Sequence, residues 1–229
     1  DAIRQVAEHN RDVVAVLVEP IQGEGGIRTL DIPYLEHLRN LCDQHGWLLM
    51  LDEVQCGIGR TGKWFAHQHS AILPDVMTLA KGLGSGVPVG ACLATGKAAG
   101  TFQPGNHGST FGGNPLASTA GLMTLTILEQ DQLLERAANT GNLLTQGLRE
   151  QLGGVAGVNA IRGQGLMIGI ELGKPCGDLV KTALTQGLLI NVTADSVIRL
   201  LPPLVFDETH ARQLLDALCP LVKDFIAHA

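Results

Sequence analysis

The sequence has no block of like charge, no apolar run long enough to cross a membrane and no signal-peptide pattern at its start. Its 16 basic and 22 acidic residues are scattered and give a formal net charge of −6, which argues against a nucleic-acid partner. A membrane span needs roughly 18 to 20 consecutive apolar residues, and a secretory signal needs a basic region followed by an apolar one. We therefore expect a cytoplasmic protein with neither a membrane nor a nucleic-acid partner.

Cysteine pairs of the C-x-x-C type are also absent, and the cysteines are odd in number and widely spaced. This spacing indicates neither a zinc site nor a disulfide framework. We expect reduced and mostly buried thiols at Cys42, Cys56, Cys92, Cys176 and Cys219. Glycine, in contrast, is abundant: the 29 glycines gather in short loops such as QGEGG, KGLGSG and STFGGN. Glycine in such loops lets the backbone approach a ligand closely.

Apolar runs alternate with an amphipathic pattern in the first half of the chain. Buried strands are predicted at residues 13–19, 47–54, 75–82 and 89–95. The segment IPYLEHLRNLCDQH places its apolar residues at helical spacing, so a helix is predicted for residues 32–45. This alternation predicts an α/β fold with a mostly parallel central sheet and helices on both faces.

The second half of the chain is first helical and then mixed. Amphipathic patterns predict helices at residues 115–128 and 131–152. After the glycine pair that follows residue 152, the predicted helices and strands become shorter. We therefore predict a large domain over residues 1–152, which includes the long linking helix, and a smaller C-terminal α+β domain over residues 153–229.

The stretch LMLDEVQCGIGRTGKW carries two signals of nucleotide-binding proteins at once. An apolar run ends in an acidic pair, and Gly57 to Lys63 fits the P-loop pattern G-x-x-x-x-G-K. The P-loop interpretation fails because Trp64 stands where that motif needs Ser or Thr to hold Mg²⁺. The acidic strand also precedes the glycine loop without an intervening strand and helix.

Other local patterns give weak signals. The glycines of GLGSG and GQGLMIG miss the G-x-G-x-x-G spacing of dinucleotide sites. His67 and His69 have no carboxylate or cysteine at ligand spacing, so we interpret them as exposed loop histidines and not as metal ligands. The plain alternative for the pair Asp52-Glu53 is a solvated strand end.

A carboxylate and a lysine at strand ends suggest a different chemistry. Glu19, Asp52 and Lys81 each lie at or just after the end of a predicted strand, where α/β sheets bind their ligands. We expect the Lys81 amine to be poorly solvated there, which favours a neutral amine that can attack a carbonyl. An anionic Asp52 suits a protonated heterocyclic nitrogen. Pyridoxal phosphate (PLP) enzymes need both groups, a lysine for the aldehyde and an acid for the pyridinium.

Five motifs in order then carry a family resemblance. They are EPIQGEGG (19–26), LDEVQCGIGRTG (51–62), LPDVMTLAKGLGSGVPVGA (73–91), HGSTFGGNPLA (107–117) and VIRLLPPL (197–204). In these motifs the chain resembles the C-terminal portion of the class III (subgroup II) PLP-dependent aminotransferases, most of all their acetylornithine branch. The resemblance covers nearly the whole chain and implies the PLP-dependent transferase fold of type I.

The resemblance also implies roles around the cofactor. It implies that Lys81 joins the PLP aldehyde covalently and then moves the substrate proton. Asp52 would hold the ring nitrogen, Gln55 would hydrogen-bond the phenolic oxygen, and Val54 would pack against a ring face. Thr110 would reach the phosphate of the PLP in a partner subunit, which implies a homodimer with shared active sites.

Arg199 lies in the apolar strand pattern VIRLLPPL, where an unpaired guanidinium is costly and a carboxylate must meet it. The resemblance implies that Glu24 pairs with Arg199 while the amine donor is bound. It further implies that the α-carboxylate of glutamate or 2-oxoglutarate then takes the place of Glu24 by a planar, bidentate contact. Glu19 is expected to lie near the substrate pocket or to orient its neighbours.

The implied reaction transfers the terminal amino group of N2-acetylornithine to 2-oxoglutarate, a step of arginine biosynthesis with amino acids and 2-oxo acids as substrates. Succinylornithine, ornithine and 4-aminobutyrate are alternative donors within the family. A catalytically incomplete structural subunit is the alternative from another class. The family's upstream phosphate loop, its stacking aromatic residue and its second substrate arginine are not found in these 229 residues. We therefore expect this stretch alone to bind PLP weakly and to turn over poorly.

Overall fold

The structure, a computed structural model, describes residues 2–228 and divides the chain into two compact units. The first unit comprises the chain up to Pro20 together with Leu30–Ile58 and Phe65–Thr126. The second unit comprises Ile21–Thr29, Gly59–Trp64 and the chain from Ile127 onward. Two short segments from the first half of the sequence thus belong with the C-terminal residues.

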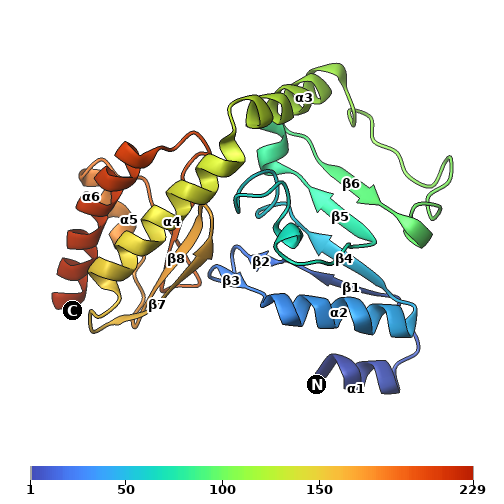
Figure 1. Cartoon of the computed structure of the whole chain (residues 1–229), viewed down its shortest axis with the longest axis horizontal. Coiled ribbons are helices and arrows are strands. Elements are labelled where there is room, and N and C mark those ends of the chain that lie inside the picture. Colours follow the sequence, from blue (N-terminus) through green and yellow to red (C-terminus); the bar gives the residue numbers. More distant parts are fainter. Residues whose placement is uncertain (1, 229) are drawn as a thin grey trace. The chain divides into compact units, whose positions relative to one another are not determined.

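The first unit is built on a four-stranded sheet in the order β1-β4-β5-β6 (Figure 1). Its strands are β1 (Ala15–Val18), β4 (Leu48–Asp52), β5 (Val76–Leu79) and β6 (Ala91–Ala94). Strand β4 pairs in parallel with both β1 and β5, whereas β5 and β6 are antiparallel. The predicted α/β fold is confirmed, but the sheet is only partly parallel. The connection between β5 and β6 contains only the short 3-10 helix η2 (Lys81–Gly84), whereas parallel strands are usually joined by a longer crossover helix.

Helix α2 (Ile32–His45) forms the core of the first unit together with β4, and it confirms the helix predicted for residues 32–45. Gly46 ends the helix in the left-handed conformation, at φ 69°, which glycine adopts without steric cost. The helical residues that pack with β4 are Leu35, Leu38, Leu41 and Cys42, all of them buried. The other helical elements of this unit are α1 (Ala2–His9), η1 (Ala66–His69), η2 (Lys81–Gly84), η3 (Gly96–Ala98) and most of α3 (Pro115–Gln130).

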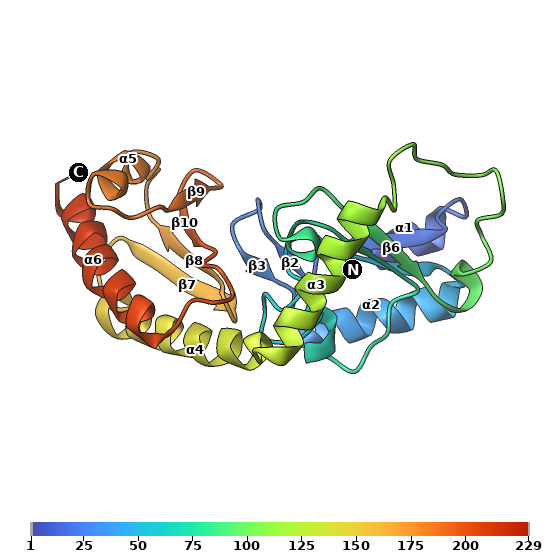
Figure 2. The same cartoon turned by 90° about the horizontal axis from the view of Figure 1, so that it is seen from above.

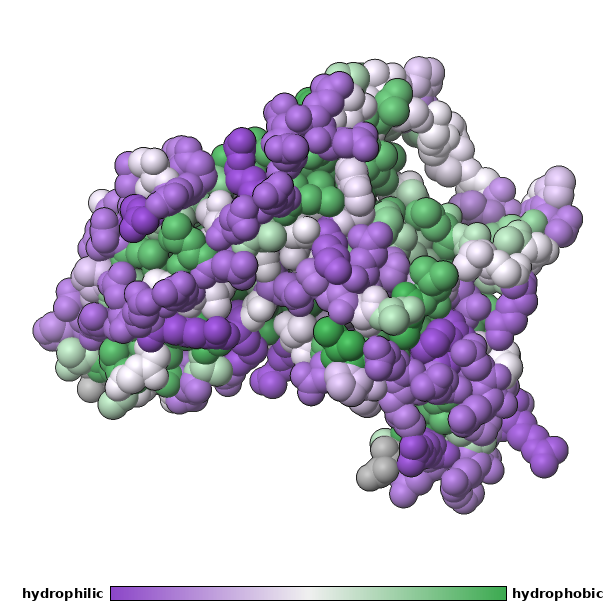
Figure 3. All heavy atoms as spheres, viewed as in Figure 1, coloured by the Kyte–Doolittle hydropathy of each residue, from purple (hydrophilic) through white to green (hydrophobic). Residues whose placement is uncertain are grey.

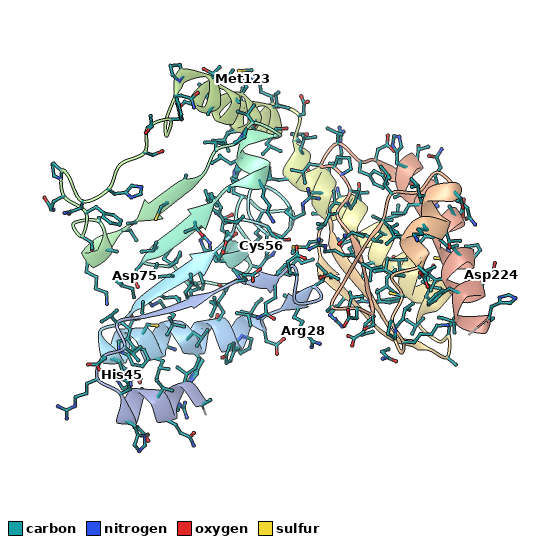
Figure 4. All side chains as sticks on the ribbon, turned by 180° about the vertical axis from the view of Figure 1, so that it is seen from behind. Arg28, His45, Cys56, Asp75, Met123 and Asp224 are labelled. Carbon is teal, nitrogen blue, oxygen red and sulfur yellow. The ribbon has the colours of Figure 1, made fainter. Side chains whose placement is uncertain are left out.

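Asp75, labelled in Figure 4, links the start of β5 to β4. Its Oδ2 accepts hydrogen bonds from the Leu49 amide and from Arg39 Nη1, each at 2.8 Å. Burial raises the pKa of Asp75, but these two donors outweigh it and leave the pKa below its ordinary value. The carboxylate therefore stabilises the fold above the unfolded-state pKa of about 3.9, and this stabilisation is lost as the pH falls through the lower folded-state pKa.

We expect Asp75→Ala to lower the free energy of unfolding by about 3 kcal/mol at pH 7, since it removes an acceptor from two mostly buried donors. Asp43→Ala is the matched control, because Asp43 also pairs with Arg39, at 2.7 Å, but is 63% exposed. It should cost less than about 1 kcal/mol. Denaturant unfolding measures both variants, and the deficit of Asp75→Ala should shrink as the pH is lowered from 7 toward 3. Equal deficits in the two variants would contradict this assignment.

The second unit contains an antiparallel sheet in the order β7-β8-β10-β9. Its strands are β7 (Val158–Gln164), β8 (Met167–Leu172), β9 (Asn191–Thr193) and β10 (Val197–Leu200). Its helices are α4 (Leu133–Leu152), α5 (Leu179–Thr185) and α6 (Glu208–Ala227), and Figure 2 shows α4 and α6 side by side along this sheet. One apolar core joins these helices to β8 and β10, so the second unit combines helices with an antiparallel sheet.

The P-loop-like segment Gly59–Trp64 is part of the second unit and has a structural role there. Arg60 Nη1 donates a hydrogen bond to the Pro202 carbonyl, and burial lowers the pKa of Arg60 to about 10. Gly62 has a φ of 87°, and a Cβ placed on it would lie 2.7 Å from the Cβ of Ala138 in α4. The glycine is therefore needed for close packing against α4.

The five cysteines differ in their exposure. Cys42, Cys56, Cys176 and Cys219 are buried free thiols, as predicted, whereas Cys92 is an exposed one.

Between residues 2 and 228, no helix is long and apolar enough to cross a membrane, and no cluster of His, Cys, Asp and Glu side chains could hold a metal ion. The two compact units divide within α3, and the division into domains 1–152 and 153–229 stays a prediction.

Candidate active site

Three residues singled out from the sequence lie at one edge of the sheet in the first unit. Glu19 follows β1, Asp52 ends β4, and Lys81 comes two residues after β5. These strands are parallel neighbours in the order β1-β4-β5, so all three residues lie at the same carboxyl edge. Ligands of α/β sheets bind at this edge.

Asp52 is half-buried and its side chain is held by two donors. Its Oδ1 accepts a hydrogen bond from the Val54 amide at 3.0 Å and from the Thr78 hydroxyl at 3.3 Å. Thr78 is the register partner of Asp52 on β5, so the contact follows directly from the strand pairing. Because a carboxylate can accept about four hydrogen bonds, an aspartate held in this way still has acceptor capacity for a ligand N–H.

Glu53, the neighbour of Asp52, is only 1% exposed and is bound from three sides. It accepts hydrogen bonds from the amides of Ala66 (2.5 Å) and His67 (2.9 Å), and its Oε1 lies 2.8 Å from His67 Nδ1. The alternative of a solvated strand end is therefore excluded for Glu53. The prediction that His67 is exposed is wrong, because its ring pairs with a carboxylate that permits its burial. His69 is half-buried. The buried pair ties the start of η1 to the end of β4, beside Asp52.

Lys81 begins η2 and has an uncommon backbone conformation. Its φ is 41°, a left-handed value that costs a residue with a side chain about 1–3 kcal/mol and is concentrated at functional sites. The side chain of Lys81 is exposed, so the residues described here do not supply the desolvation that the sequence predicts. Two structural features therefore distinguish Lys81 as a candidate functional residue: its strained backbone and its position after the strand that neighbours the strand of Asp52.

The other predicted cofactor residues lie in two loops of the first unit. Val54 and Gln55 are half-buried in the turn that follows Asp52. Thr110 lies in the segment 99–113, whose side chains are all exposed. The structure thus places Val54 and Gln55 next to Asp52, whereas Thr110 projects from a separate exposed loop.

Arg199 and Glu24, both in the second unit, form an ion pair. Arg199 Nη1 lies 2.6 Å from Glu24 Oε1, and Arg199 Nε donates a hydrogen bond to Asn191 Oδ1 at 3.1 Å. The Arg199 side chain is 11% exposed and that of Glu24 is 71% exposed. The carboxylate that the sequence requires near Arg199 is therefore Glu24, and Asn191 is a further partner that the sequence does not reveal.

Comparison with known proteins assigns the family. The aminotransferase class-III family matches residues 1–222. Acetylornithine aminotransferase of Nitrosomonas europaea is 55% identical over 226 residues, which cover 99% of this chain and 58% of that protein. Acetylornithine aminotransferase 1 of Bordetella bronchiseptica is 56% identical over the same shares of the two chains. The chain therefore belongs to the class III aminotransferases, as its motifs predict, and spans somewhat over half the length of these relatives.

Solved structures agree with this assignment. Ornithine aminotransferase from Toxoplasma gondii ME49 matches with a TM-score of 0.94 and 34% identity, over 100% of this chain and 55% of that one. Acetylornithine aminotransferase from Elizabethkingia anophelis matches with a TM-score of 0.91 and 35% identity, over 98% of this chain and 58% of that one. The mixed α/β architecture is thus that of PLP-dependent aminotransferases.

Class III aminotransferases depend on PLP, and one solved Toxoplasma gondii ornithine aminotransferase is described with partial PLP occupancy at its active site. The residues at the carboxyl edge fit this cofactor. Asp52, which is fixed by hydrogen bonds, and Lys81, which has a primary amine, lie at the ends of neighbouring strands. When bound, PLP withdraws electrons from the substrate carbon that loses a proton. Asp52 would supply the anion for its ring nitrogen, and Lys81 would supply the amine for its aldehyde.

Proposed function

We propose that the complete protein transfers the terminal amino group of N2-acetylornithine to 2-oxoglutarate, giving the semialdehyde and glutamate. The observation that carries this proposal is the Arg199–Glu24 pair, in which a mostly buried guanidinium is paired with an exposed carboxylate. The 44% to 56% identity to several acetylornithine aminotransferases supports the choice of donor. Amino acids and 2-oxo acids are then the substrates, arginine biosynthesis the pathway and the cytoplasm the location.

An exchange of anions at Arg199, between Glu24 and a substrate carboxylate, explains how one protein accepts two kinds of substrate. A guanidinium with 11% exposure needs an anion, because an unpaired buried charge is costly. Glu24 supplies this anion while the amine donor is bound. A substrate with its own carboxylate can replace it by a bidentate contact, and Glu24, at 71% exposure, returns to water at little cost. Glu19 is proposed to lie near the substrate.

The remaining residues are assigned to the cofactor. Lys81 would hold PLP through its aldehyde and would move the substrate proton during transfer, while Asp52 would favour the protonated ring nitrogen. Val54 packs against the ring and Gln55 donates a hydrogen bond to its phenolic oxygen. These assignments are supported by the position of Val54 and Gln55 directly after the held Asp52. The fold is proposed to be PLP-dependent transferase type I, with helices on both faces of the large sheet.

A homodimer is part of the proposal, with Thr110 binding the phosphate of the partner subunit's cofactor. It is supported by the exposed apolar side chains around Thr110, since soluble proteins rarely leave large apolar patches uncovered. Figure 3 shows apolar surface over α3 and β6 of the first unit. The exposed residues include Phe102, Phe111, Leu116 and Leu122, at 64% or more exposure.

Single-turnover reactions of the complete PLP-loaded protein test the donor. N2-acetylornithine should react with a kcat/KM at least about tenfold above that of ornithine, succinylornithine or 4-aminobutyrate. The loss of the absorbance of bound PLP measures each half-reaction. A higher value for another donor would reassign the protein within its family, and no reaction with any of the four would overturn the proposal.

Glu24→Gln is the companion variant for this experiment. It removes the anion that competes for Arg199, so the KM for glutamate should fall while the KM for N2-acetylornithine rises. Glu208→Gln is the matched control, since Glu208 is a similarly exposed glutamate in an ion pair with Arg212 on α6. It should change neither KM.

A further inference from the structure

The segment that carries Glu24 is a hairpin too short to be stable on its own. Its strands β2 (Ile21–Gln22) and β3 (Arg28–Thr29) have two residues each, and isolated short hairpins are at best marginally stable in water. Figures 1 and 2 both show this hairpin close to the sheet of the second unit, where β3 contacts β7. Its conformation must therefore depend on contacts outside the hairpin.

The turn of the hairpin is anchored at four consecutive carbonyl groups. The Glu24 carbonyl accepts a hydrogen bond from the hydroxyl of Thr193 on β9 at 2.5 Å. The Gly25 carbonyl accepts one from Nε of Arg28, labelled in Figure 4, at 3.2 Å. The next two carbonyls, of residues 26 and 27, each accept from Nε of Arg162 on β7 at 3.0 Å, and Arg162 Nη2 lies 2.6 Å from the first of them.

The anchors are themselves fixed in the sheet. Arg162 pairs with Glu171 of the neighbouring strand β8, so its guanidinium is neutralised and oriented while it holds the hairpin. Thr193 is 7% exposed. Ile27 is fully buried, and a Cβ placed on Gly169 of β8 would lie 2.9 Å from the Ile27 Cβ. The hairpin can therefore pack here only because Gly169 has no side chain. The main chain of Glu24 is thus held by polar and apolar contacts, while its side chain is 71% exposed.

Building on the proposed function, we propose that Thr193 and Arg162 are positioning residues for the Glu24–Arg199 exchange. They fix the Glu24 main chain, and Asn191 fixes Arg199 from the same strand as Thr193. Only the Glu24 side chain then moves when a substrate carboxylate arrives. Loss of an anchor lowers the occupancy of the Glu24–Arg199 pair, which weakens the amine-donor step and spares the glutamate step.

Thr193→Val tests this inference in the complete protein, since valine keeps the shape and the strand preference and removes only the hydroxyl donor. The ratio of kcat/KM for the amine donor to kcat/KM for glutamate should fall roughly five- to tenfold. Thr193→Ser, which keeps the hydroxyl, should restore the ratio. In the Glu24→Gln background, Thr193→Val should change the ratio by less than about twofold, because the negative charge that it positions is gone.

Hydrogen exchange supplies a readout that does not depend on the reaction. Amides of residues 21–29 should exchange faster in Thr193→Val and in Arg162→Lys, which cannot reach both carbonyls and Glu171 with a single nitrogen. Thr140→Val is the matched control, because Thr140 is also a buried threonine that donates to a carbonyl, that of Phe206, away from the hairpin. Unchanged exchange in the hairpin, or an equal loss in both half-reactions, would overturn the inference. If no donor reacts, the proposed function fails, and the exchange data still decide whether the anchors hold the hairpin.

Discussion

Replacement of Lys81 by alanine is expected to lower the rate of transamination by at least about 10⁴-fold. On the proposed assignment, the variant removes both the nucleophile for PLP and the base for the substrate proton, and proton transfer alone contributes about 10² to 10⁴. The exposed side chain makes little contribution to the core, so the melting temperature should change little. Borohydride reduction followed by peptide mass analysis of the complete protein should locate PLP on Lys81 and find none in the variant.

Lys63→Ala is the control for this prediction. Lys63 is also exposed, and it completes the letters of the P-loop pattern. Its replacement should leave the rate within about twofold of the parent protein, as expected of an exposed residue without catalytic contact. PLP that remains fixed to Lys81→Ala after reduction would show that another amine is the nucleophile. An equal loss of rate in both variants would show that the effect is not specific to residue 81.

The predictable part of this structure is local in sequence. Helix α2 carries a helical period of apolar residues, and this period alone predicts a helix over residues 32–45. Asp52 and Lys81 were recognisable because each follows a continuous apolar strand, and parallel strands bring their ends to one edge. In both cases the relevant signal lies within a few residues of the feature itself.

The direction of β6 shows a limit of such reasoning. An apolar run predicts a strand but not its pairing direction, and β6 pairs antiparallel with β5. The burial of Glu53 and His67 is a second case, because their contact joins residues on either side of a glycine-rich loop. Neither residue belongs to a periodic sequence pattern from which its burial could be predicted.

Longer-range contacts account for the rest of the candidate site. Thr193 and Arg162 hold a hairpin more than a hundred residues earlier in the chain, and an isolated threonine or arginine in a strand gives no sign of such a partner. Gly62 likewise looked like part of a phosphate loop, although close packing against α4 is what requires it. Patterns in a single sequence predict the local backbone conformation. The roles of Thr193, Arg162 and Gly62 depend instead on residues that are distant in sequence and become neighbours only in the folded chain.

Asp52→Asn should reduce transamination roughly 10³-fold while preserving the local geometry. Asparagine keeps an Oδ1 that can accept from the Val54 amide and the Thr78 hydroxyl, so the turn after β4 is retained. On the proposed assignment, what is lost is the negative charge that would keep the ring nitrogen of PLP protonated. Removing one partner of such a charge pair costs about 3–5 kcal/mol, and each 1.4 kcal/mol or so is a factor of ten in rate. Single-turnover rates per PLP bound measure the effect.

A cofactor analogue separates charge from shape in this test. PLP methylated at the ring nitrogen carries a permanent positive charge, so it should recover a large part of the rate lost in Asp52→Asn. Asp75→Asn is the matched control at the amino end of β5: it should lower the melting temperature through the Leu49 amide and Arg39, yet leave the rate per folded, PLP-loaded molecule unchanged. If the methylated analogue gives no recovery, Asp52 acts through the geometry of the turn and not through its charge.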